Sequence, residues 1–134
     1  MSVQTEIDNA EVVRRGYAAF NAADVATLTE LMDENVSWHT PGRSPIAGDY
    51  LGRDAVFGHF DRYGGDTNGT FKAELKQLFS ADDGRVIGLH HNSAERNGKR
   101  LDTDCCVVFE VENGRIISGR EHFSDLHNWD EFWS

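Results

Sequence analysis

The sequence is poor in cysteine and proline, and it has no long apolar run. Its two cysteines, Cys105 and Cys106, are adjacent. On a strand they would point to opposite faces, which predicts reduced thiols rather than a disulfide. With only two prolines and no low-complexity tract, the chain is expected to fold as a single domain over residues 1–134.

No segment reaches the roughly 18 apolar residues of a membrane span, and the first residues lack the pattern of a signal peptide. We therefore expect a cytoplasmic protein with no membrane partner.

Positive charge is also scarce. Lysine and arginine number 13 against 23 aspartates and glutamates, and the net charge is −10. A chain of this charge is repelled at long range by nucleic acids and by anionic membranes. We expect neither as a partner.

The first half of the chain has the periodicity of helices. Apolar residues recur every three or four positions between Ile7 and Phe20, which predicts one face of a helix. Asp24 is a good N-cap for a second helix over Val25–Met32. A third helix is predicted from about Arg53 to Tyr63 because Gly64 and Gly65 follow it.

Strands dominate the second half. A short strand, Val36–Thr40, precedes the third helix and is followed by a loop over residues 42–52 that is rich in glycine and proline. Asn97-Gly98 is a strong hairpin signal, and four strands are predicted around this and similar turns: Phe71–Phe79, Val86–Arg96, Lys99–Val111 and Arg115–Phe123. In the first of these, the face of Phe71, Ala73, Leu75, Gln77 and Phe79 is expected to be buried.

Helices followed by an antiparallel meander predict an α+β fold with the helices on one face of the sheet. A long meander buries both layers only if it curls around the three N-terminal helices, so we expect a cone with one deep pocket. The tail after Ser124 contains Trp129, Phe132 and Trp133. We expect the two tryptophans to plug the cone or to pack on a partner subunit.

Several segments, taken in order, resemble a known family. They are Gly16–Asp24 with Asp33–Val36, Pro45–Val56, Asn113–Ile117 and Glu121–Asp125. Together they resemble the SnoaL-like, ketosteroid-isomerase-like branch of the NTF2-like superfamily over about residues 8–127. The resemblance implies a cone-shaped, cystatin-like fold with a curved antiparallel sheet. The superfamily includes cyclases, isomerases, dehydratases, epoxide hydrolases and binding proteins without chemistry, so the pocket residues must decide the function.

By this resemblance the cavity is lined by the first strand, the third helix and the inner face of the meander. Alternation along the strands then gives the expected pocket residues: Tyr17, Trp38, Thr40, Phe57, Phe60, Asn92, Cys105, Val107 and Phe123. The ionisable candidates are His90, Glu121 and, near the mouth, Asp125. A register slip of one residue would replace His90 by His91 and Glu121 by His122.

Two known chemistries of the superfamily do not fit. The steroid isomerases use a carboxylate base and a protonated carboxylic acid, and the matching positions here are Thr40 and Cys105. An Asp-Arg-Asp cluster of the epoxide-hydrolase type would need Asp102, Asp104 and Arg120, which the register directs outward. The six histidines lack metal-ligand spacing. We expect neither a metal nor another cofactor.

The favoured function is that of a cofactor-independent, polyketide-cyclase-like lyase or isomerase that moves a proton on an apolar carbonyl compound. His90 and Glu121 would carry the proton, with Asp125 assisting, because a histidine and a carboxylate in an apolar cavity can shift each other's pKa towards working pH. Aromatic walls suit a small apolar or aromatic ligand. The alternatives are a non-catalytic binding module and an interaction module. We also expect a homodimer through the outer sheet face, formed by Ile87, Cys106, Val108 and Ile116.

Overall fold

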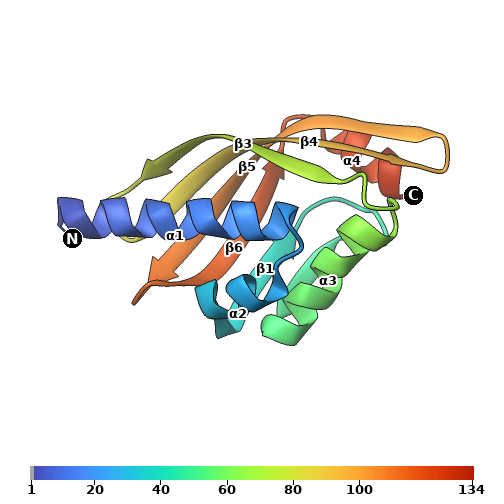
Figure 1. The fold of residues 1–134 in the computed structure, drawn as a ribbon. Helices are drawn as coiled ribbons and strands as arrows, with labels where there is room; N and C mark the ends of the chain where they lie inside the picture. The colour runs from blue at the N-terminus through green and yellow to red at the C-terminus, as the bar shows by residue number, and fades with distance from the viewer. Residues whose placement is uncertain (1) are drawn as a thin grey trace.

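The computed structural model describes residues 2–134 and places most helices before most strands, as expected (Figure 1). The elements in chain order are α1 Val3–Asn21, α2 Val25–Leu31, β1 Met32–Thr40, β2 Gly48–Leu51, α3 Arg53–Gly65, β3 Lys72–Ser80, β4 Arg85–Arg96, β5 Lys99–Glu112, β6 Arg115–Phe123 and α4 Leu126–Trp133.

Side-chain caps mark where three of the helices begin. Ser2 accepts a hydrogen bond from the backbone N–H of Thr5 at the start of α1. Asp24 caps α2 through Thr27, as predicted. Asp125 caps α4 through the N–H of Asn128. Each cap satisfies a backbone donor that has no partner within its own helix.

The strands form one six-stranded sheet in the order β2-β1-β6-β5-β4-β3. Neighbours are antiparallel except β1 and β6, which pair in parallel and place Trp38 beside Gly119. Figure 1 shows α1 lying across one face of this curved sheet, with α2 and α3 on the same side. The predicted α+β architecture is confirmed. The parallel pairing of β1 with β6 joins the early part of the chain to its last strand.

Two elements lie where only a loop and a tail were predicted. β2 forms within the loop of residues 42–52 because it pairs with β1, with Tyr50 opposite Trp38. Helix α4 forms in the tail and buries Trp129, Phe132 and Trp133. The two tryptophans pack on Tyr63 and Phe71 within the chain, which agrees with the predicted plug.

Two irregularities in the sheet reverse the expected faces of nearby residues. In β6, Ser118 pairs with Glu110 but Ile116 pairs with Val111, so Ile117 is an extra residue. This bulge turns Ile116 into the core, where it is 1% exposed, and corrects its predicted place on the outer face.

A register shift in β3 has the same kind of effect. Leu75 pairs with His90 and Gln77 with Leu89, so Lys76 is the extra residue. Beyond it Leu78 packs against the core, whereas Phe79 is 46% exposed and Gln77 is exposed. The predicted buried face was therefore right for Ala73 and Leu75 but wrong for Gln77 and Phe79.

Among residues 2–134, no helix combines the length and the hydropathy that crossing a bilayer requires.

Candidate functional site

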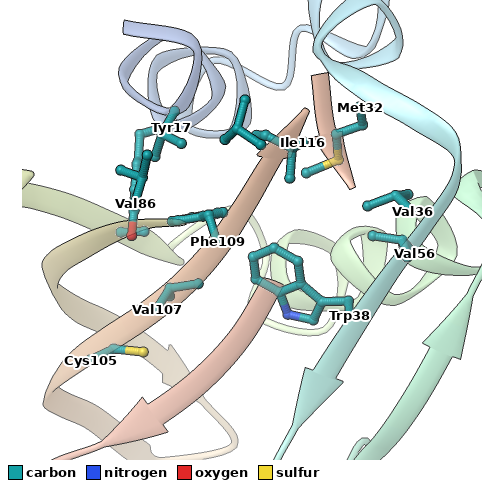
Figure 2. Close-up of a cluster of buried hydrophobic side chains, with 13 residues drawn as sticks. Tyr17, Met32, Val36, Trp38, Val56, Val86, Cys105, Val107, Phe109 and Ile116 are labelled. Carbon is teal, nitrogen blue, oxygen red and sulfur yellow. The ribbon is translucent and has the colours of Figure 1, made fainter. Parts of the chain in front are cut away.

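A cavity lies between the helices and the inner face of the sheet, with a volume of about 50 Å³. Most of its wall is apolar and includes Val13, Phe20, Phe60, Val107, Phe109 and Ile116. Figure 2 shows the Trp38 and Phe109 rings beside each other in this core, with centroids 5.8 Å apart.

One buried carboxyl group interrupts the apolar wall. Glu121, on β6, is 3% exposed and lines the cavity. Three side chains donate hydrogen bonds to its Oε1: the Trp38 indole at 3.0 Å, the Thr40 hydroxyl at 2.5 Å and the Tyr63 hydroxyl at 2.8 Å. No described residue donates to its other oxygen, Oε2. The carboxyl group is thus held at one oxygen, and its second oxygen has no partner among residues 2–134.

Burial raises the pKa of the Glu121 carboxyl group, and the hydrogen bonds from Thr40, Trp38 and Tyr63 oppose that rise. The raised pKa makes the carboxylate a stronger base than a solvent-exposed glutamate. The three donors stabilise the ionised form, so the group can both hold a negative charge and take up a proton. This combination is typical of a general base.

Gly119 gives the Trp38 indole the space to reach Glu121. A Cβ atom at position 119 would lie 2.1 Å from Cζ3 of Trp38 and 2.4 Å from its Cε3. Only a residue without a side chain lets the ring lie this close to β6. The position of the indole donor therefore depends on this glycine.

His59 lies behind two of the side chains that donate to Glu121. His59 and Tyr63 lie on the buried stripe of α3, and Nε2 of His59 is 2.8 Å from the Thr40 hydroxyl and 2.9 Å from that of Tyr63. Each hydroxyl has one proton, which it donates to Glu121. The Nε2–H of His59 must therefore be the donor to both oxygens.

This assignment leaves Nδ1 of His59 as a bare acceptor, consistent with its lack of a partner among the described residues. Burial, and then the nearby charge of Arg62, lower the pKa of His59 to about 4. The imidazole is therefore neutral at neutral pH. It stacks on Tyr50 with centroids 3.9 Å apart.

The sequence prediction missed both His59 and Tyr63. They follow Val56 at spacings of three and seven residues, the spacing of a helix face that packs on a core. Polar side chains on such a face were the signal that could have identified them.

The other polar group in the cavity is centred on His90 of β4. The Tyr17 hydroxyl lies 2.7 Å from Nδ1 of His90, and Nε2 lies 2.9 Å from Oδ1 of Asn92. Burial lowers the pKa of His90 to about 4, against the opposing hydrogen bond to Asn92. Burial raises the pKa of the Tyr17 hydroxyl. Both rings are therefore neutral at neutral pH.

The structure brings most of the predicted pocket residues to this cavity. Besides His90 and Glu121, the wall includes Tyr17, Trp38, Phe60, Asn92 and Val107. His90 and Glu121 make no hydrogen bond to each other, because each is bonded to its own group of partners. Burial moves their pKa values in opposite directions, so only Glu121 is shifted towards neutral pH.

Five predicted residues lie away from the cavity wall. Asp125 is exposed at the start of α4, where its carboxylate is the helix cap. Thr40 is buried and reaches the site only through its hydrogen bond to Glu121. Cys105 is buried in the core, Phe57 packs against that core, and Phe123 stacks on Trp129. The strand direction was right for Thr40, Cys105 and Phe123, but neighbouring side chains separate them from the void.

Three side chains of a possible Asp-Arg-Asp cluster were predicted to point away from the cavity. Asp102, Asp104 and Arg120 are exposed on the outer face, as the register predicted. Within residues 2–134, no three or more histidine, cysteine or acidic side chains lie together in a way that could hold a metal ion.

Comparison with known proteins places this chain in a family. The SnoaL-like domain family matches residues 13–119. The solved structure of Bal32a, from a soil-derived mobile gene cassette, is 67% identical in sequence with a TM-score of 0.96, and it covers 97% of this chain and 99% of its own. An uncharacterised protein of Mycobacterium tuberculosis is 32% identical over 130 residues, which are 97% of this chain and 99% of that protein.

A more distant structure shows the same fold. It is described as a putative SnoaL-like polyketide cyclase from Jannaschia sp. CCS1, with 14% identity and a TM-score of 0.79 over 100% of this chain and 97% of that one. The resemblance and the cystatin-like fold predicted from the sequence are confirmed. The chain belongs to the SnoaL-like domain family.

Proposed function

We propose that this protein is a cofactor-independent, polyketide-cyclase-like lyase or isomerase that transfers a proton on a small apolar carbonyl compound. The observation that supports this most directly is the state of Glu121. It is buried in an apolar cavity, held by three donors at Oε1, and has no partner at Oε2 in the described part of the chain. Its family includes proteins described as cyclases, which supports the same class of reaction.

In the proposed step the Glu121 carboxylate takes a proton from the carbon next to the carbonyl group. The C–H bond breaks, its electron pair forms a carbon–carbon double bond, and the carbonyl oxygen gains the negative charge of an enolate. The protonated carboxyl group exchanges its proton with water and then returns a proton to carbon, which restores the carboxylate. No electron leaves the substrate, so the step needs no oxidant or reductant.

The raised pKa of Glu121 supports this role, because a general base works best when its pKa lies near the working pH. His90 is neutral and hydrogen-bonded at both ring nitrogens, so it is not suited to carry the proton. Asp125 has no role in the step because it caps α4 outside the cavity.

The step can be tested without knowledge of the natural substrate. In deuterated buffer, exchange of the hydrogens next to the carbonyl of 2-tetralone is followed by proton NMR. We expect the protein to accelerate this exchange and Glu121→Gln to reduce the catalysed rate by about 10²–10⁴-fold, the usual contribution of a general base. The catalysed rate should fall as the pH drops below the pKa of Glu121, because only the carboxylate form accepts the proton.

Asp125→Asn is the matched control, since it makes the same carboxylate-to-amide change and keeps an oxygen that can cap α4. It should retain the wild-type rate. Undiminished exchange in Glu121→Gln would refute the proposed step. Binding of 2-tetralone by the wild-type protein without any exchange would instead identify a non-catalytic binding protein.

A further inference from the structure

Asn92 has a buried donor with no partner among the residues that the structure describes. The residue is 1% exposed, lies on the inner face of β4 and lines the cavity. Its Nδ2 makes no hydrogen bond to any described residue. A buried N–H group without an acceptor costs stability, and native proteins contain few of them. A donor of this kind in a cavity wall points to an acceptor on a ligand.

The neighbouring hydrogen bonds fix the direction of this carboxamide. Burial raises the pKa of Tyr17, so its hydroxyl keeps its proton, and Nδ1 of His90 is the acceptor within reach at 2.7 Å. That nitrogen is therefore bare and the proton of the neutral ring lies on Nε2. Nε2–H donates to Oδ1 of Asn92 at 2.9 Å. With Oδ1 used in this way, both hydrogens of Nδ2 remain without an acceptor.

We infer that Asn92 binds the carbonyl oxygen of the ligand through Nδ2 and that the ligand is a neutral molecule. The Tyr17 and His90 side chains act as positioning residues that hold the carboxamide in this orientation. The inferred reaction role, stabilising the oxygen as it becomes an enolate, rests on the proposed function. The binding role does not.

The charge around the cavity determines the class of ligand. No lysine or arginine is among the described residues of the cavity wall, and Glu121 supplies the one acidic group. The chain as a whole carries a net charge of −10. A carboxylate or phosphate on the ligand would meet repulsion with no compensating cation. A ketone, aldehyde or neutral ester on an apolar or aromatic body satisfies both the donor and the wall.

A pair of probes of matched shape tests the inference. Acetophenone and α-methylstyrene differ mainly in that a C=O group of the first is replaced by a C=CH₂ group in the second. Both are titrated into ¹⁵N-labelled protein and followed by NMR. We expect acetophenone to bind about tenfold more tightly, since one net hydrogen bond of about 1.4 kcal/mol corresponds to a tenfold change in Kd.

The variant Asn92→Leu removes the donor at similar side-chain size. It should bind both probes with equal affinity, whereas Asn35→Leu, the same change at an exposed asparagine, should keep the tenfold preference. A preference for acetophenone that survives in Asn92→Leu would overturn the inference. The wild-type protein gives a second readout that depends on no variant: acetophenone must shift the side-chain amide proton resonances of Asn92, and unmoved resonances at saturation would also overturn it.

This experiment separates the two proposals. Glu121→Gln should keep the preference for acetophenone, because binding at Asn92 does not require proton transfer. Preserved preference together with undiminished 2-tetralone exchange in that variant would refute the proposed reaction and leave the carbonyl site standing. Loss of exchange in Glu121→Gln, together with no preference for acetophenone in the wild type, would refute the carbonyl site and leave the proposed reaction standing.

Discussion

The substitution Gly119→Ala tests how tightly the site is built. The added methyl group would lie 2.1 Å from Cζ3 of Trp38, whereas carbon atoms in contact are normally about 3.5–4.0 Å apart. The indole must therefore move by more than about 1 Å, which would break its 3.0 Å hydrogen bond to Glu121. Overpacking of a core costs about 1–3 kcal/mol, and a lost hydrogen bond to a charged group costs about 1.5–3 kcal/mol. We expect a loss of about 3–5 kcal/mol in the free energy of unfolding.

Urea denaturation measures this loss, and the melting temperature should fall by about 10–18 °C. The control is the same substitution in a Trp38→Leu background, which lacks the ring atoms that the methyl group meets. There the cost of Gly119→Ala should fall below about 1 kcal/mol, and the difference between the two backgrounds gives the coupling energy. A cost below about 1 kcal/mol in the wild-type background would refute the reasoning.

Three other predictions concern pH and assembly. The raised pKa of Glu121 means that its contribution to stability is fully present below the unfolded pKa and is lost as the pH rises through the folded pKa. In urea unfolding, Glu121→Gln should therefore gain stability relative to the wild type between pH 4 and pH 8; a constant difference would contradict this. His91 lies between Asp104 and Asp102, whose hydrogen bonds raise its pKa. In Asp104→Asn, an NMR titration should show a lower pKa for His91 than in the wild type. Urea unfolding of this variant should show a smaller loss of stability as the pH rises through the pKa of His91. An unchanged titration would show that the contact is absent in solution. The proposed homodimer should give twice the monomer mass in light scattering, and Val108→Glu on the outer face should halve it; a wild-type monomer at micromolar concentration would end that proposal.

Strand alternation was sufficient to predict the inner face of the long hairpin. The Asn97-Gly98 turn sets the register of β4 and β5, so His90 and Asn92 point inward as expected. In the last strand the residues after Gly119 were also placed correctly. Ile116 was not, because a single extra residue at 117 reverses every side chain on its far side and leaves no clear mark in the composition.

The hydrogen-bonded partners of Glu121 could not be predicted from the sequence. Trp38 and Thr40 reach it only because β1 pairs in parallel with β6, a contact between strands far apart in the chain. Tyr63 reaches it from the buried face of α3, and His59 on the same face contacts the hydroxyls of Thr40 and Tyr63. Local pattern identifies which residues are buried, but it does not identify which buried polar groups meet. The capping role of Asp125 was missed for a related reason, because the helix that it caps was not predicted.

The parallel pairing of β1 with β6 also has a consequence for the order of folding. The site draws Trp38 and Thr40 from an early strand and Glu121 from the last one. Contacts between distant parts of a chain form late, because closing a long loop costs entropy before the contact gives any return. During synthesis the helices and β1 would emerge with no carboxylate to surround, and the apolar surface they expose would stay open until the final strand docks. The candidate site is therefore completed only when the last strand docks on β1.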